Sequence, residues 1–106
     1  MAREKFKTLT EQMYYVLMAL QEERCGVDVM AVVKEMTDQR IKLGPGTLYA
    51  LLGDFQREGL IKETEAVGSK RSYQLTDEGK ERLKQEHERH MLLIRDYQQY
   101  FKGGQR

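Results

Sequence analysis

A chain of 106 residues is long enough for one domain and too short for two ordinary ones. Its 40% hydrophobic residues exclude a disordered polar chain, no apolar run approaches the roughly 20 residues of a membrane helix, and the polar N-terminus lacks a secretory signal, so we expect a cytoplasmic protein without a membrane partner. The 18 basic and 17 acidic residues nearly cancel, so a DNA-binding surface would depend on a local group of cations.

The first two predicted elements are helices with one apolar face. Glu11–Glu23 follows Thr10, whose hydroxyl can cap the first turn, and Val27–Gln39 follows a short polar stretch. Apolar residues recur at helical spacing in both, at Met13, Val16, Leu17 and Leu20 and at Val29, Val32, Val33 and Met36. Cys25 lies between them, and as a single cysteine it is expected to be a buried thiol.

A third helix is predicted around the only proline. The short alternating segment Ile41–Leu43 first predicts a minimal strand. Gly44 then suits the N-cap of a helix and Pro45 its first position, where no amide donor is needed. This helix is expected to run to Glu58, with an inner face formed by Leu48, Leu51, Leu52 and Phe55.

The remaining elements are a hairpin and a long helix. Leu60–Val67 and Ser72–Leu75 read as two strands joined by a turn with a basic tip. Such a short hairpin is marginal alone, so we expect it to pack beside the helices. Thr76 then caps the last helix, whose first turn carries two carboxylates where the helix dipole favours them.

The last helix carries a heptad-like apolar seam. An apolar stripe of this length on a small domain indicates a partner, and we expect a second copy of the chain. The predicted dimerisation residues are Leu83, His87, His90, Met91, Ile94, Tyr97 and Phe101. His87 and His90 could make pairing sensitive to pH, although hydrogen-bonded histidines at the edge of a core are more common. A metal site is not expected, because other ligands are missing nearby.

The order of the elements predicts the fold class. It is typical of an α+β, mainly helical, winged helix-turn-helix fold with an added C-terminal dimerisation helix. We therefore expect a DNA-binding domain over residues 1–76 and a dimerisation helix with its tail over residues 77–106.

Two sequence motifs resemble the PadR family of bacterial repressors. The first motif is Gly44–Tyr49, which reads Gly-Pro-Gly-Thr-Leu-Tyr, and the second is Glu58–Ile61. The segments Gly68–Tyr73 and Leu75–Gly79 also match the family pattern. The resemblance covers about Leu9 to Leu83. It implies a double-stranded DNA operator, a homodimer joined through the last helix, and release by a small-molecule effector. The single C-terminal helix is similar to the shorter branch of the family.

The residue types of the third helix suit contact with DNA. Small and hydrogen-bonding residues at its start let the backbone approach closely, and its free amides can bind a phosphate oxygen. The predicted DNA-binding residues are Gly46, Thr47, Tyr49, Ala50, Lys70 and Arg71. The alternatives are capping for Thr47, core packing for Tyr49, and an ordinary solvated turn for the two cations.

Departures from the family pattern lower the expected positive charge. Gly53 and Asp54 stand where many relatives carry a basic residue on the recognition helix, Ser69 stands where relatives often carry another in the wing, and Val27 replaces a usual tyrosine. The near-neutral net charge and the residues Gly53 and Asp54 favour a rival function, a winged-helix protein-interaction module that dimerises but has little affinity for DNA.

The sequence predicts a homodimeric transcriptional repressor rather than an enzyme. No nucleophile motif, phosphate loop or acid/base cluster appears, and no cofactor is expected. Two-fold symmetry would present two recognition helices to adjacent major grooves, about 34 Å apart, on a pseudo-palindromic operator.

Overall fold

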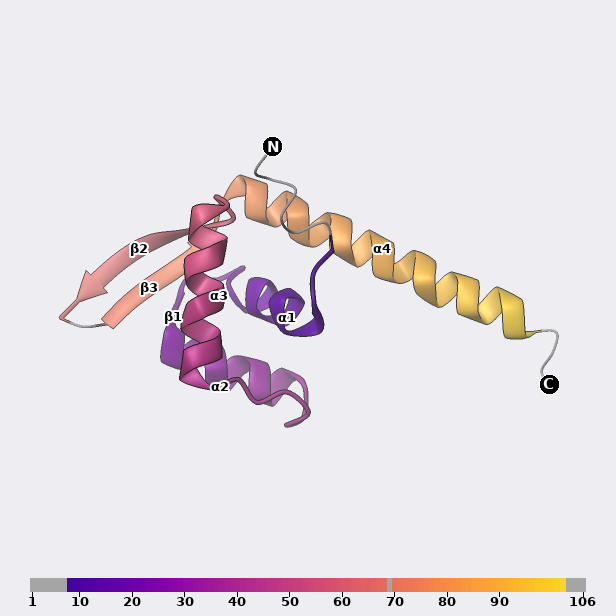
Figure 1. Ribbon diagram of the computed structural model, residues 1–106, viewed down its shortest axis with the longest axis horizontal. Helices are drawn as coiled ribbons and strands as arrows, with labels where there is room; N and C mark the ends of the chain where they lie inside the picture. Colours follow the sequence, from indigo (N-terminus) through magenta and orange to yellow (C-terminus); the bar gives the residue numbers. More distant parts are fainter. Residues whose placement is uncertain (1–7, 69, 103–106) are drawn as a thin grey trace.

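The computed structural model describes residues 8–68 and 70–102, and the predicted wing position Ser69 lies outside them. The elements in chain order are α1 (Glu11–Ala19), β1 (Arg24–Cys25), α2 (Gly26–Met36), α3 (Pro45–Arg57), β2 (Ile61–Val67), β3 (Lys70–Leu75) and α4 (Asp77–Lys102). Figure 1 shows three short helices packed together, with the β2–β3 hairpin (the wing) and the far half of α4 projecting in opposite directions. The predicted α+β winged helix-turn-helix class is confirmed.

The sheet has three antiparallel strands in the order β1-β3-β2. In the wing, the register runs from Ile61 opposite Leu75 to Val67 opposite Lys70. On the other edge of β3, the two residues of β1 pair with Tyr73 and Ser72. The sequence therefore located the hairpin but missed β1, which is too short to show a periodic pattern.

The strand predicted at Ile41–Leu43 is wrong, because these residues form an irregular segment before α3. Ile41 and Leu43 are each 8% exposed and belong to the core, while Lys42 between them is exposed. The alternating pattern that predicted a strand therefore belongs to a loop, in which every second side chain packs against the core.

The helix starts agree with the sequence better than the helix ends. The Thr10 hydroxyl accepts a hydrogen bond from the Met13 amide at 3.2 Å, and Gly44 and Pro45 take the N-cap and first positions of α3. The predicted end of α1 at Glu23 is wrong because the Leu20 carbonyl leaves the helix and accepts from Leu75 in the sheet.

The second predicted helix is also too long. α2 stops at Met36 because Asp38 and Gln39 adopt positive φ angles of 54° and 66°, which no helix interior allows. The Thr37 hydroxyl closes this end by donating to the Val33 carbonyl at 2.8 Å. α3 ends at Arg57, one residue before its predicted end.

The core lies between the first three helices and the sheet. Most residues predicted to face inward are buried there, including Val16, Leu17, Leu20, Val29, Val33, Leu48, Leu52 and Phe55. Met13, Val32 and Leu51 pack against this core while partly exposed, and Met36, at 39% exposure, is an exception. Cys25 is buried, as expected for a structural thiol.

α4 is anchored at its start and free beyond its middle. The Thr76 hydroxyl accepts from the Gly79 amide at 3.0 Å and donates to the Gly59 carbonyl at 2.6 Å. The first half of the helix then packs along α1, whereas every side chain from Met91 to Phe101 is exposed. None of the helices within the described residues is long and apolar enough to span a bilayer.

Candidate nucleic-acid interface

The first turn of α3 is exposed because the opposite face of this helix is buried. Leu48 and Leu52 fix the helix on the core, which turns Gly46, Thr47 and Ala50 outward. A Cβ added at Gly46 would meet no atom within 4 Å. Packing within this chain therefore does not require glycine at this position, and the surface above it is open to an approaching partner.

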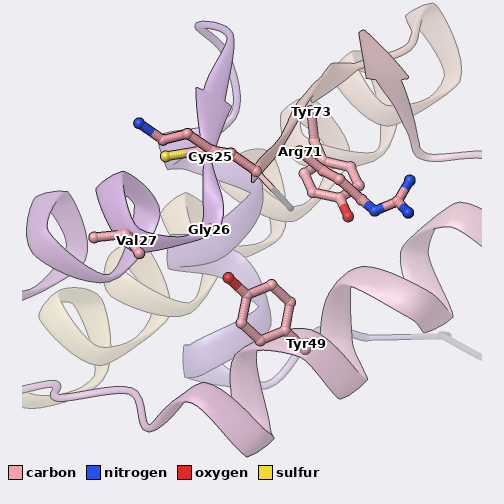
Figure 2. Close-up of a pocket in the computed structure, with 7 residues that line it drawn as sticks. Cys25, Gly26, Val27, Tyr49, Arg71 and Tyr73 are labelled. Carbon is pink, nitrogen blue, oxygen red and sulfur yellow. The ribbon is translucent and has the colours of Figure 1, made fainter. Parts of the chain in front are cut away.

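Tyr49 lies against the start of α2 rather than in the core. Its side chain is 48% exposed, and a Cβ built on Gly26 would lie 2.4 Å from the Tyr49 phenol oxygen. A glycine at position 26 therefore makes room for this tyrosine. Figure 2 shows the Tyr49 hydroxyl directed from α3 toward Gly26 and Cys25.

A pocket of about 540 Å³ separates α3 from the sheet (Figure 2). We call it the Tyr49 pocket, and its lining consists of Cys25, Gly26, Val27, Tyr49, Lys70, Arg71 and Tyr73. The structure thus brings three of the predicted DNA-binding residues together, one from α3 and two from the wing. The other three, Gly46, Thr47 and Ala50, lie outside this lining on the exposed face of α3.

Ion pairs reduce the positive charge around α3. The Arg71 guanidinium contacts both carboxylate oxygens of Glu63, at 3.0 and 3.2 Å, within the wing. Arg57 pairs with Asp54 on α3 itself. Lys70, by contrast, forms no ion pair with another residue in the described part of the chain. Lys70 is therefore a cation of this surface whose charge is not engaged in an ion pair.

Tyr73 is the buried polar residue of the Tyr49 pocket, with 6% exposure. Burial, followed by the nearby charge of Glu63, raises the pKa of its phenol above the ordinary value of 10.0, against the opposing effect of Arg71. The hydroxyl is therefore protonated at neutral pH and available as a donor.

The predicted dimerisation residues occupy two environments. Leu83 packs against the core of its own chain, and the half-buried His90 contacts the Tyr14 ring edge-on at 4.7 Å between ring centres. His87 is exposed. The remaining members, Met91, Ile94, Tyr97 and Phe101, are exposed by 52, 50, 66 and 49% on the projecting half of α4.

A buried carboxylate ties α4 to the start of α1. Glu86 is 3% exposed, accepts a hydrogen bond from the Leu9 amide at 3.2 Å, and pairs with Arg89. Burial alone would raise the pKa of Glu86, but the hydrogen bonds from Arg89 and Leu9 outweigh it and hold the pKa below its ordinary value of 4.5. The ionised form is therefore part of the folded structure.

Sequence reasoning missed Gly26, Tyr73 and Glu86 as site or anchoring residues. The alternation of Tyr73 with Leu75 indicated an inward-facing tyrosine, but nothing in the sequence paired β3 with β1. Glu86 had no such signal, because it lies in a run of charged residues that looks solvated throughout.

Comparisons with known proteins agree with this fold. The family model described as the transcriptional regulator PadR-like family matches residues 16–85. A PadR family transcriptional regulator from Eggerthella lenta is 27% identical, with a TM-score of 0.68 over 85% of this chain and 80% of that one. Bacillus subtilis PadR in complex with operator DNA is also 27% identical, with a TM-score of 0.64 over 72% of this chain and 46% of that one.

A more distant structure has the same fold. RosR from H. salinarum is 22% identical, with a TM-score of 0.65 over 88% of this chain and 94% of that one. A comparison with curated protein sequences gives no match.

Proposed function

The chain belongs to the PadR-like family of transcriptional regulators. From this premise we propose that it is a homodimer that binds double-stranded operator DNA and represses transcription. In this proposal α3 enters the major groove while the wing lies against the flanking backbone. The family consists of regulators, and the proposed activity involves no catalysis. Its place of action would be the cytoplasm, where prokaryotic DNA lies.

The observation that carries the proposal is the exposed first turn of α3. Gly46, Thr47 and Ala50 combine small size with hydrogen-bonding capacity, and the space above Gly46 is open. The N-cap Gly44 has no side chain to satisfy the first amides of the helix. These amides can instead donate to a phosphate oxygen, which the helix dipole favours. B. subtilis PadR, whose structure with operator DNA is similar, supports the same use of the fold.

We assign dimerisation to the projecting half of α4. No other described residues pack against its exposed apolar side chains. A helical segment without tertiary packing is only marginally stable in water, and an exposed apolar stripe marks a partner site. A second copy of the same helix supplies a matching apolar stripe. Residues 1–76 then form the DNA-binding unit, and residues 77–106 form the dimerisation unit.

A protein-interaction module is the second candidate function. The near-neutral net charge and the Arg71–Glu63 and Arg57–Asp54 pairs weaken the positive field that DNA binding needs. Salt dependence separates the two candidates. Each neutralised phosphate contributes about −0.9 to the slope of log K against log salt concentration, so DNA binding should weaken steeply as salt rises. A protein partner held by few charges should show a shallow slope.

Selection of bound sequences from random double-stranded DNA tests the repressor proposal directly. We expect a two-fold symmetric consensus, and a reporter with that sequence over its promoter should be silenced by the protein. Thr47→Ala should weaken binding to the consensus, whereas Thr8→Ala, at an exposed threonine outside the interface, should not. A failure to enrich any sequence at low salt would contradict the proposal. The enriched DNA then allows small molecules to be screened for release, the remaining part of the proposal.

A further inference from the structure

The Tyr49 pocket contains a tyrosine hydroxyl without a hydrogen-bond partner. Tyr73 is 6% exposed and lines the pocket, yet its hydroxyl forms no hydrogen bond with any residue in the described ranges 8–68 and 70–102. Figure 2 shows this hydroxyl directed into the space between β3 and α3. The residue as a whole is buried while its hydroxyl reaches the pocket space, so the hydroxyl is available to bind a ligand or water there.

The start of α2 opens into the same pocket. Cys25, its N-cap, provides no side-chain hydrogen bond to the first turn of this 11-residue helix, and Gly26 and Val27 follow in the pocket lining. The first amides of a helix lack acceptors within the helix, and its dipole places partial positive charge there. The Tyr49 hydroxyl lies beside Gly26 and adds another donor.

The charge of the lining also suits an anion. Among the residues that the structure describes, the lining contains two cations and no carboxylate. Glu63, the carboxylate that faces Tyr73 across the wing, is held by Arg71. Lys70 forms no ion pair among the described residues, although Glu23, Asp28 and Glu65 line a neighbouring pocket with it. Two phenol donors, a helix start and one lysine therefore meet in a single cavity.

We propose that the Tyr49 pocket binds a phosphoryl group through the hydroxyls of Tyr49 and Tyr73 and the first amides of α2, with Lys70 supplying the opposite charge. The pocket is larger than one phosphate, so it has room for a phosphoryl group attached to a larger molecule. That molecule is either the DNA backbone, in which case the inference rests on the proposed function, or a free phosphate ester. The phosphoryl chemistry is the same for both sources.

Amide NMR spectra of the full chain, titrated with inorganic phosphate against sodium chloride at equal ionic strength, test the pocket itself. We expect saturable shifts of the Gly26 and Val27 amides. Tyr73→Phe keeps the ring and removes only the unpartnered oxygen, so the chain should fold normally and its phosphate dissociation constant should rise about tenfold. Tyr100→Phe is the matched control, because this tyrosine is 81% exposed on α4. Absence of saturable shifts, or equal binding by Tyr73→Phe, would overturn the proposal.

A second variant tests the same pocket from its other wall. Gly26→Ala forces the Tyr49 ring to move, since the added Cβ would overlap the phenol. We expect phosphate affinity to fall in this variant too, with the dispersion of its NMR spectrum reporting whether it remains folded. A folded Gly26→Ala chain with wild-type phosphate affinity would contradict the assigned donors.

Operator DNA distinguishes the two sources. If a backbone phosphate fills the pocket, inorganic phosphate competes with DNA beyond its ionic-strength effect, and Tyr73→Phe weakens DNA binding about tenfold. If a free phosphate ester fills the Tyr49 pocket, inorganic phosphate still shifts the Gly26 amide resonance when DNA is bound. Either result supports the proposal that the pocket binds a phosphoryl group. Phosphate binding without any DNA binding would refute the proposed repressor and keep the pocket. DNA binding without saturable phosphate shifts would refute the phosphoryl-binding pocket and leave the proposed repressor standing.

Discussion

Glu86 in α4 and Leu9 before α1, 77 positions apart in the sequence, are joined by a hydrogen bond from the Leu9 amide to a buried carboxylate oxygen. Arg89 pairs with the same carboxylate, and His90 lies 3.5 Å from it. The contact fixes the long helix on the DNA-binding unit. A charge this deeply buried is stable only while its partners remain in place.

Glu86→Gln should make the protein less stable at neutral pH and less sensitive to acid. The folded-state pKa of Glu86 lies below its ordinary value of 4.5, so its stabilising effect is complete above that value and is lost as the pH falls through the folded-state pKa. We expect a loss of about 1–3 kcal/mol at pH 7 that shrinks toward pH 3. Urea unfolding at both pH values measures this, with the exposed Glu88→Gln as control. An undiminished difference at pH 3 would refute the assigned role.

Gly79→Ala should destabilise the fold strongly. A Cβ at this position would lie 2.0 Å from the Leu60 backbone carbonyl oxygen, so α4 would have to move away from the α3–β2 corner. We expect a loss of about 3 kcal/mol in the free energy of unfolding. Gly53→Ala is the control, because its Cβ meets only the end of the Arg57 side chain at 3.5 Å, and it should stabilise α3 by about 0.5–1 kcal/mol. Equal stability of the two variants would contradict this packing.

Gly46→Ala should separate stability from DNA binding. The added methyl group meets open space within the chain, so thermal stability should stay the same or rise slightly. In the proposed complex the same methyl group lies between α3 and the DNA backbone, and we expect affinity for the selected operator to fall about tenfold, or about 1.4 kcal/mol. Fluorescence anisotropy measures the affinity. Unchanged binding would show that the start of α3 does not approach DNA.

Ile94→Glu should yield monomers without loss of the winged-helix fold. Ile94 is 50% exposed on the projecting half of α4, so the substitution disturbs no core contact in the single chain. A carboxylate placed in the apolar dimer surface should raise the dimer dissociation constant at least about a hundredfold. Light scattering after size exclusion reports the mass, and Gln99→Glu is the control, because Gln99 lies about 140° around the helix from Ile94. A persistent dimer would place the interface elsewhere.

The sequence predicted the elements whose signals are local. Thr10 and Pro45 mark helix starts through their own chemistry, and helical spacing marks the core faces of all three short helices. The end of α1 could not be predicted in this way, because it depends on the Leu20 carbonyl meeting Leu75 in a distant strand. Likewise, β1 forms because its two residues pair with the edge of β3, and a two-residue sequence pattern cannot reveal such pairing.

Some residues of the candidate site were predicted from the sequence, but its arrangement was not. Tyr49, Lys70 and Arg71 were identified from helix and hairpin positions, yet no sequence pattern indicated that they share a pocket with Gly26 and Tyr73. Neither could it show that Glu63 engages Arg71, since that pair depends on the register of the wing. Contacts between elements, rather than residue types, decide which cations remain available.

The unbroken course of α4 has a mechanical consequence. Its 26 residues form a rod about 39 Å long, clamped at one end by Thr76 and Glu86 and free at the other. One residue inserted after His90 would turn the free end by about 100° relative to the clamped end, whereas seven would restore nearly the original phase. In a dimer built on that free end, the reach and the twist of the rod would together set which separations between operator halves the two copies can bridge.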